Sequence, residues 1–125
     1  MRVSNGDIWQ AREAIGDLVK EKLPVKTSYW LAKLGRKVNE HIRDIEAVRV
    51  KLVHEYGTKD EQGNVSIPAG MPEVAKFLAA FGELMDETVE IEGIDRITLP
   101  TNTGLTITPA ALMALEPFVE VADVP

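Results

Sequence analysis

The sequence contains no cysteine, which excludes a disulfide framework, a thiol nucleophile and a zinc site built on thiolates. Proteins of a reducing cytoplasm commonly show this absence. Long hydrophobic runs are missing too, since none approaches the ~20 apolar residues that a membrane-spanning helix needs. The first ten residues, MRVSNGDIWQ, lack the apolar segment of a secretion signal. We therefore expect a soluble cytoplasmic protein with no membrane partner.

Residues in patterns typical of catalysis, metal binding or phosphate binding are also few. The two histidines, His41 and His54, are thirteen positions apart, which on one helix turns them about 220° away from each other and prevents joint binding of a metal. None of the serines lies in a Gly-x-Ser-x-Gly turn, and the nine glycines are scattered singly, so the sequence has no phosphate-binding loop. The sequence thus predicts a non-enzymatic protein, with no catalytic residue, no metal site and no cofactor.

One charged stretch, EYGTKDEQGNVSIP, has the composition of a metal-binding loop. A calcium loop of the EF-hand type needs glycine at its sixth position, but counted from Asp60 that position is Val65. We interpret the stretch instead as a helix that ends at Gly57 in the left-handed conformation. A hairpin-like turn follows, in which residues 62–64 supply the positive φ angles.

The length of 125 residues and the 45% hydrophobic content suit one domain spanning residues 1–125. Charge divides this domain into two unlike halves. Residues 1–56 contain 11 Lys and Arg against 8 Asp and Glu, whereas residues 57–125 contain 3 against 12. The net charge of −6 disfavours binding of the whole molecule to nucleic acid, although the basic half could touch a phosphate backbone locally. Solvated helices are the plainer explanation of the basic half.

The first half is predicted to form two amphipathic helices. Helix-start residues in SNGD begin an apolar pattern over residues 5–21, and Pro24 interrupts it. A second helix starts at Thr27 or Ser28, either of which can cap it, and its apolar stripe consists of Leu31, Leu34, Val38, Ile42, Ile45, Val48, Leu52 and Tyr56. The second helix is predicted to be longer than the first. The part of it that the first helix cannot reach must therefore be covered by the rest of the chain or by a second copy. A homo-oligomer is therefore one possibility.

The second half, residues 57–125, reads as a mixture of short strands and helices. Val65 and Ile67 alternate with polar residues, and a third helix over residues 71–86 has an apolar face of Val74, Phe77, Leu78, Phe81, Leu84 and Met85. Alternation returns in TVEIEGIDRITLP, and a short strand LTIT precedes a helix that Thr108 caps. An edge strand is predicted in the tail FVEVADVP.

The expected fold class is α+β. It consists of an N-terminal antiparallel helical hairpin (1–56) with a long second helix, then a third helix and a small antiparallel sheet with a short C-terminal helix (57–125).

Six residues are candidates for contact with a partner: Tyr29, Trp30, Asp86, Glu87, Glu90 and Glu92. The two aromatic residues are adjacent in a helix and point about 100° apart, so one of them is expected to be exposed and could anchor a protein. The four carboxylates surround the start of a strand. Glu90 and Glu92 are expected to share its solvent-facing side about 7 Å apart, a spacing also seen in paired-carboxylate hydrolases.

Three segments carry a resemblance to a known family: SNGDIWQAREAIGDLVKEKLPVKTSYWLAKLGRKV, HEYGTKDEQGNVSI and LTITPAALMALEPFVE. Together they resemble a family of small uncharacterised proteins encoded by tailed bacteriophages and prophages. The shared features are an early Lys-Leu-Pro-Val-Lys connection, a long helix ending in a Tyr-Gly turn with acidic residues, and a final Leu-x-Ala-Leu-Glu-Pro helix. The resemblance implies a phage origin, in the bacterial cytoplasm or in the virion, and supplies no catalytic residue.

The sequence therefore favours a non-enzymatic phage or prophage accessory protein that binds another protein, of host or phage, in particle assembly or against a host factor. An acidic protein that mimics nucleic acid and inhibits a host nuclease or polymerase is the alternative, because the second half is strongly acidic. A small hydrolase that uses Glu90 and Glu92 ranks third.

Overall fold

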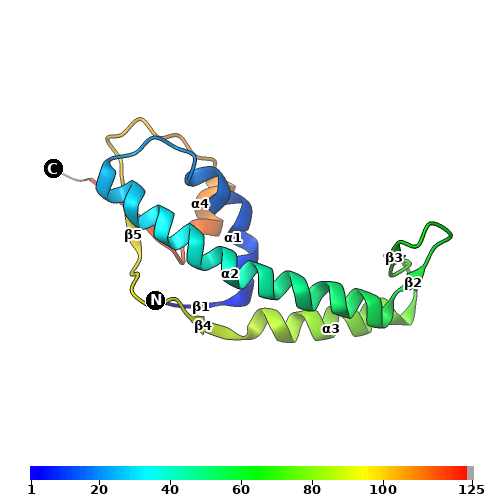
Figure 1. Ribbon diagram of the computed structural model, residues 1–125. Helices are drawn as coiled ribbons and strands as arrows, with labels where there is room; N and C mark the ends of the chain where they lie inside the picture. Colours follow the sequence, from blue (N-terminus) through cyan, green and yellow to red (C-terminus); the bar gives the residue numbers. More distant parts are fainter. Residues whose placement is uncertain (124–125) are drawn as a thin grey trace.

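The computed structural model describes residues 1–123, which form a head and a projecting arm (Figure 1). The helices are α1 (Asn5–Leu18), α2 (Val25–Tyr56), α3 (Pro72–Asp86) and α4 (Pro109–Leu115). The strands are β1 (Arg2–Ser4), β2 (Thr58–Lys59), β3 (Val65–Ser66), β4 (Thr88–Glu90), β5 (Ile97–Pro100) and β6 (Val119–Ala122). The α+β class, the packed pair α1 and α2, and the long α2 confirm the predicted architecture.

The helical pair begins with a capping box. The Ser4 hydroxyl accepts a hydrogen bond from the Asp7 backbone N–H, and the Asp7 carboxylate accepts one from the Ser4 N–H. Gly35 lets α2 approach the end of α1, because a Cβ atom there would lie 3.2 Å from a methyl group of Val19.

The start of α2 differs from the prediction. The helix begins at Val25, with Pro24 as its N-cap and no side chain capping it, instead of being capped by Thr27 or Ser28. The Ser28 hydroxyl donates to the carbonyl of Leu23, so it is not used as a cap. Proline fits this position because its fixed φ suits the chain that enters a helix.

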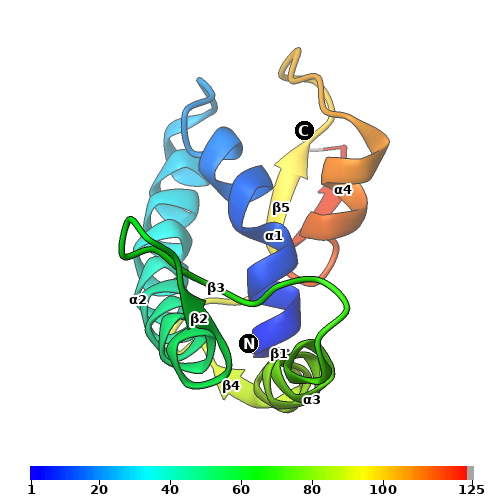
Figure 2. The same ribbon diagram turned by 90° about the vertical axis from the view of Figure 1, so that its right-hand side faces the viewer.

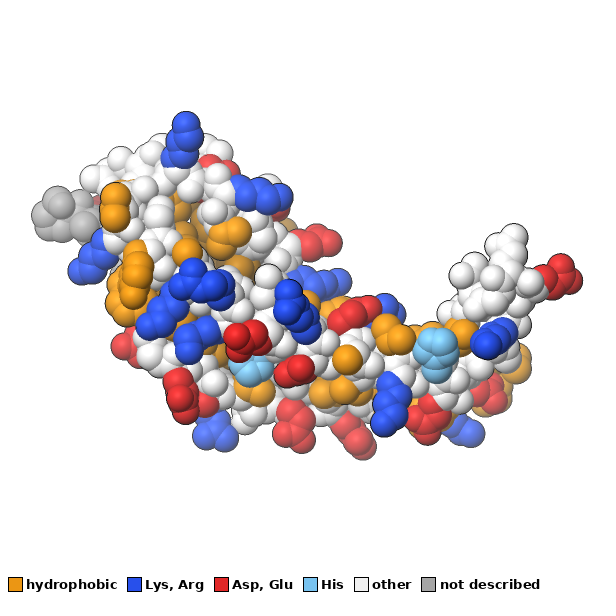
Figure 3. Space-filling model, viewed as in Figure 1, with side chains coloured by type: hydrophobic (Ala, Val, Ile, Leu, Met, Phe, Trp, Pro, Cys, Tyr) orange, Lys and Arg blue, Asp and Glu red, His pale blue; other side chains and the backbone are white. Residues whose placement is uncertain are grey.

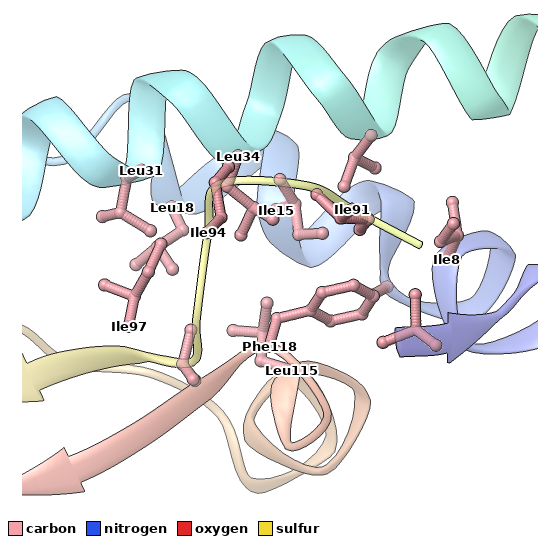
Figure 4. Close-up of a cluster of buried hydrophobic side chains, with 14 of the residues drawn as sticks. Ile8, Ile15, Leu18, Leu31, Leu34, Ile91, Ile94, Ile97, Leu115 and Phe118 are labelled. Carbon is pink, nitrogen blue, oxygen red and sulfur yellow. The ribbon is translucent and has the colours of Figure 1, made fainter. Parts of the chain in front are cut away.

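The core lies in the head, between the two long helices and the C-terminal part of the chain (Figure 4). Side chains from α1, α2, the segment 91–99 and the end of α4 meet there. The largest fully enclosed ones are Ile8, Leu31, Leu34, Val38, Ile45, Ile91, Leu115, Phe118 and Val119. The segment after β4 contributes to this core although it is mostly irregular, because Ile91, Ile94 and Ile97 all point inward.

The prediction that the strands form one small antiparallel sheet is wrong in its number of sheets and in the direction of one strand pair. The described residues form three two-stranded sheets, in which β1 pairs with β4 and β2 with β3 antiparallel, whereas β5 and β6 are parallel. Parallel strands need a crossover, and α4 lies in the connection between β5 and β6. The predicted strand at residues 105–108 is irregular instead, since this segment leads into α4 and its Thr108 hydroxyl caps that helix.

The arm comprises residues 46–86, in which the second half of α2 runs beside α3 and the β2–β3 hairpin forms the tip (Figures 1 and 2). The arm is attached to the head by Asn5, whose backbone N–H donates to Glu87 O at 2.8 Å and whose side-chain amide donates to Leu84 O at 3.0 Å. Pairing of β1 with β4 continues this attachment. The end of α3 is therefore bound to the first residues of the chain.

The helix end at Gly57 also differs from the prediction. Its φ is −93°, which is not left-handed, and glycine is needed there because a Cβ atom would collide with the carbonyl of Val53. In the following turn only Gly63 has a positive φ, at 84°, so Gln62 and Asn64 do not supply this conformation. The interpretation of the stretch as a helix end followed by a hairpin is otherwise confirmed.

Candidate functional site

The histidines and carboxylates do not converge. Among residues 1–123, no three of the possible protein ligands lie close enough together to hold a metal ion. His41 and His54 both lie on α2. No helix in this part of the chain combines the length and the apolar composition needed to span a membrane.

Of the two predicted aromatic contact residues, Tyr29 is the exposed one, at 57%. Trp30 is half-buried and meets the Tyr29 ring edge to face, with 5.2 Å between the ring centroids. The Lys33 ammonium lies 5.2 Å from the centre of the Trp30 ring, a cation–π distance. Trp30 therefore belongs to a basic and aromatic corner of the head.

The four predicted carboxylates lie one after another but do not form one strand face. Asp86 ends α3, Glu87 is its C-cap, and Glu90 ends β4. Glu92 lies in the turn after β4, so the prediction that Glu90 and Glu92 share a strand face is wrong. The Glu90 carboxylate lies 3.3 Å from the Met1 amino group, which also donates to the carbonyls of Ile91 and Ile94. Glu90 thus has a structural ion-pair partner.

The arm carries exposed apolar side chains. No residue from 46 to 90 is buried, although α3 is rich in apolar side chains. Hydrophobic side chains are visible along the arm among charged ones (Figure 3). We define the arm surface as the large apolar residues of the arm that are exposed: Val48, Val50, Met71 and Leu78.

Aromatic contacts hold α3 in place beneath this surface. Phe77 and Phe81 stack with their ring centroids 5.7 Å apart, and Phe81 meets Trp9 of α1 edge to face at 5.9 Å. Leu78 was predicted to lie on the buried face of this helix but is 61% exposed. The reason is that the main contacts of α3 among the described elements are with α1 and α2, which leaves part of its wide apolar face uncovered.

A short ion pair lies at the base of the arm. The Arg49 guanidinium donates two hydrogen bonds to the Glu46 carboxylate, at 2.6 and 3.0 Å. These hydrogen bonds lower the pKa of Glu46 and raise that of Arg49. Both side chains are more than one third exposed, so the pair contributes little to stability.

We expect the pKa of the Glu46 carboxyl group to be lower in the folded protein than in Arg49→Gln, because the charged partner and its hydrogen bonds are lost in the variant. The folded-state pKa is the depressed one, so the small stabilisation is present above the unfolded-state pKa and is lost as pH falls through the folded-state pKa. A carboxyl-carbon NMR titration of both proteins measures this. Equal pKa values would show that the pair does not form in solution.

A cavity of about 600 Å³ opens in the head between the first turn of α2 and β5. Its walls include Trp30, Ile97 and Pro100, and Lys26, Asp95 and Arg96 stand among its polar lining. The volume lies within the ~300–1,000 Å³ typical of ligand pockets. Sequence reasoning did not find this cavity, because it joins residues that are about 70 positions apart and belong to no motif. The available signal was the run from Lys22 to Asn39, which contains five Lys and Arg and no acidic residue.

The chain matches no family model, no curated protein and no solved structure in comparisons with known proteins.

Proposed function

We propose that this protein works by binding another protein along its arm and catalyses no reaction. The observation that carries the proposal is the absence of any buried residue between positions 46 and 90, in a segment whose two helices are amphipathic. Apolar side chains left in water cost free energy in proportion to their exposed area. Contiguous apolar surface that is left uncovered is typical of a binding site.

The arm is suited to contact because it projects from the head (Figure 1). Apolar side chains around it come from Leu78 on α3, from Met71 just before α3, and from Val48 and Val50 on α2. Charged residues lie between them, as is common in interfaces that form and separate. A second copy of the chain is one partner that such a surface could bind.

We place this binding in the biology of a tailed bacteriophage or prophage, either in particle assembly or against a host factor. Support comes from the three segments that resemble the phage family. Capture of specific proteins from cells that carry such a phage, with the purified chain as bait, tests both parts of this proposal.

The decisive comparison uses Leu78→Lys as bait beside the wild type. We expect the captured protein to bind the variant at least tenfold more weakly, because a charge replaces an apolar contact in the interface. Met113→Lys is the matched control, since Met113 is 75% exposed but lies on α4 in the head. Light scattering of the same proteins shows whether the partner is a second copy. Equal capture by wild type and Leu78→Lys, or no specific capture, would contradict the proposal.

A further inference from the structure

We infer that the head cavity binds the C-terminal end of an extended peptide, with its terminal carboxylate at the first turn of α2 and its backbone beside β5. This inference deepens the proposed function, because the ligand is a protein segment, but it concerns a surface separate from the arm. Four observations carry it: free backbone donors, a hydroxyl group without a protein partner, the charge around the cavity and an open strand edge.

The first turn of α2 presents unpaired donors to the cavity. The first bond of the helix runs from the Ser28 N–H to the Pro24 carbonyl, so the N–H groups of Val25, Lys26 and Thr27 have no backbone partner. No side chain caps them, and the first turn contains no acidic residue. Lys26 and Thr27 line the cavity. The start of a 32-residue helix is thus left with free donors and the positive end of its dipole, which together favour an anion.

Thr27 is the independent sign of a ligand. Thr27 lines the cavity, the residue as a whole is only 9% exposed, and its side chain forms no hydrogen bond with any residue from 1 to 123. The Thr27 hydroxyl oxygen is not among the buried side-chain atoms of residues 1–123 that lack a partner, so it is open to the cavity and to the water in it. An anion placed at the helix start would accept hydrogen bonds from this hydroxyl and from the adjacent N–H groups.

The charge around the cavity favours a single negative group. Lys26 forms no ion pair with a described residue, whereas Arg96 is held in place by the carbonyls of Glu116 and Val119 at 2.8 Å each. Asp95 also lines the cavity and would repel a ligand with several acidic groups. One carboxylate at the end of an otherwise uncharged chain with an apolar last residue matches this pattern, because Trp30 and Pro100 supply apolar walls.

The open edge of β5 makes the ligand an extended chain. The N–H groups of Ile97 and Thr101 donate to Phe118 O and Ala122 O, on the side of β6. Alternate residues of a strand face opposite neighbours, so the N–H and carbonyl groups of Thr98 face away from β6. β5 runs between α2 and β6 in the head (Figure 2), and Thr98 lines the cavity. An extended peptide can pair with these free groups.

The edge also limits the length of that pairing. Pro100 has no N–H group, so hydrogen bonding along this side of β5 weakens two residues after Thr98. A short pairing suits the last residues of a chain better than a strand that passes through the cavity. A chain end also carries the single carboxylate that the first turn of α2 favours.

The test uses the full chain and N-acetylated pentapeptides of Ser-Thr-Val-Thr followed by Val, Leu or Phe. Each peptide is made with a free C-terminal carboxylate and as the amide, and a third set ends in Asp with an amidated terminus. Amide NMR spectra recorded during each titration report binding. We expect the free-acid peptides to shift the signals of Lys26, Thr27 and Thr98, and the amidated peptides to bind at least tenfold more weakly.

Variants at Thr27 test the hydroxyl group. Thr27→Val keeps the shape of the side chain and should weaken binding of the free-acid peptides about tenfold, whereas Thr27→Ser should restore it. Thr106→Val, in an exposed loop outside the cavity, is the matched control. The amide spectra of the unliganded variants show whether each one is folded.

Several results would overturn the inference. If no free-acid peptide shifts any amide signal, the cavity is not a peptide-binding site. If free-acid and amidated peptides bind equally well, the terminal carboxylate is not recognised. Equal binding of the peptides that end in amidated Asp would assign the anion to a side chain instead of a chain end. Leu78→Lys should bind these peptides as the wild type does, and Thr27→Val should keep the arm partner, so failure of one proposal is separable from failure of the other.

Discussion

Phe118→Ala is expected to destabilise the protein by about 3–5 kcal/mol, because Phe118 has no exposed surface and its ring fills the centre of the head. The loss of stability has two parts. The variant lacks the favourable free energy of transferring an aromatic ring out of water, and a cavity remains among Ile8, Leu115 and their neighbours. For a chain of 125 residues this corresponds to a fall in melting temperature of roughly 10–20 °C. Thermal and urea unfolding followed by circular dichroism measure both quantities.

Leu78→Ala is the control for this experiment, since Leu78 is 61% exposed. Removing its side chain should change the free energy of unfolding by less than about 1 kcal/mol. If the two variants were equally destabilised, the side chain of Leu78 would be buried in solution. The arm would then be covered in the free protein, and the arm surface would not be available to a partner.

Gly57→Ala is expected to cost about 1–3 kcal/mol and to loosen the tip of the arm. A Cβ atom at this position would collide with the carbonyl oxygen of Val53 and would lie 2.8 Å from that of Ser66. Both obstacles are backbone atoms, so the end of α2 or the β2–β3 hairpin has to move. Thermal unfolding gives the loss of stability, and hydrogen exchange of the Thr58 and Val65 amides locates it.

Gly82→Ala provides the opposite case, because a Cβ atom at this position in α3 would meet nothing within 4 Å. Alanine is the better helix former, so this variant should be more stable by up to about 1 kcal/mol. Destabilisation by both substitutions would indicate that α3 is packed more closely in solution. Stabilisation by Gly57→Ala would contradict the described helix end.

Helix positions were predictable because they depend on local patterns. The apolar spacing from Ile8 to Leu18 places α1, and Thr108 followed by Pro109 marks the start of α4. The prediction placed Leu78 on a buried face because periodicity identifies an apolar stripe without showing how much of it a neighbour covers.

The pairing of β5 with β6 could not be predicted because it joins residues about 20 positions apart across a helix. Alternation along TVEIEGIDRITLP indicates strand segments but gives no partner or direction. The turn at residues 92–93 breaks that alternation, and for this reason Glu92 does not lie on the expected strand face. The cavity could not be predicted for the same reason, since Thr27 and Thr98 line one cavity only in the folded chain.

The unbroken length of α2 has a geometric consequence. Its 32 residues correspond to a rod of about 48 Å, with Thr27 near one end and Tyr56 at the other. The same rod borders the proposed peptide site and forms half of the arm, so both surfaces are fixed to one stiff axis. If both were occupied at once, α2 would set the spacing between the two bound molecules, and the protein would act as a molecular ruler.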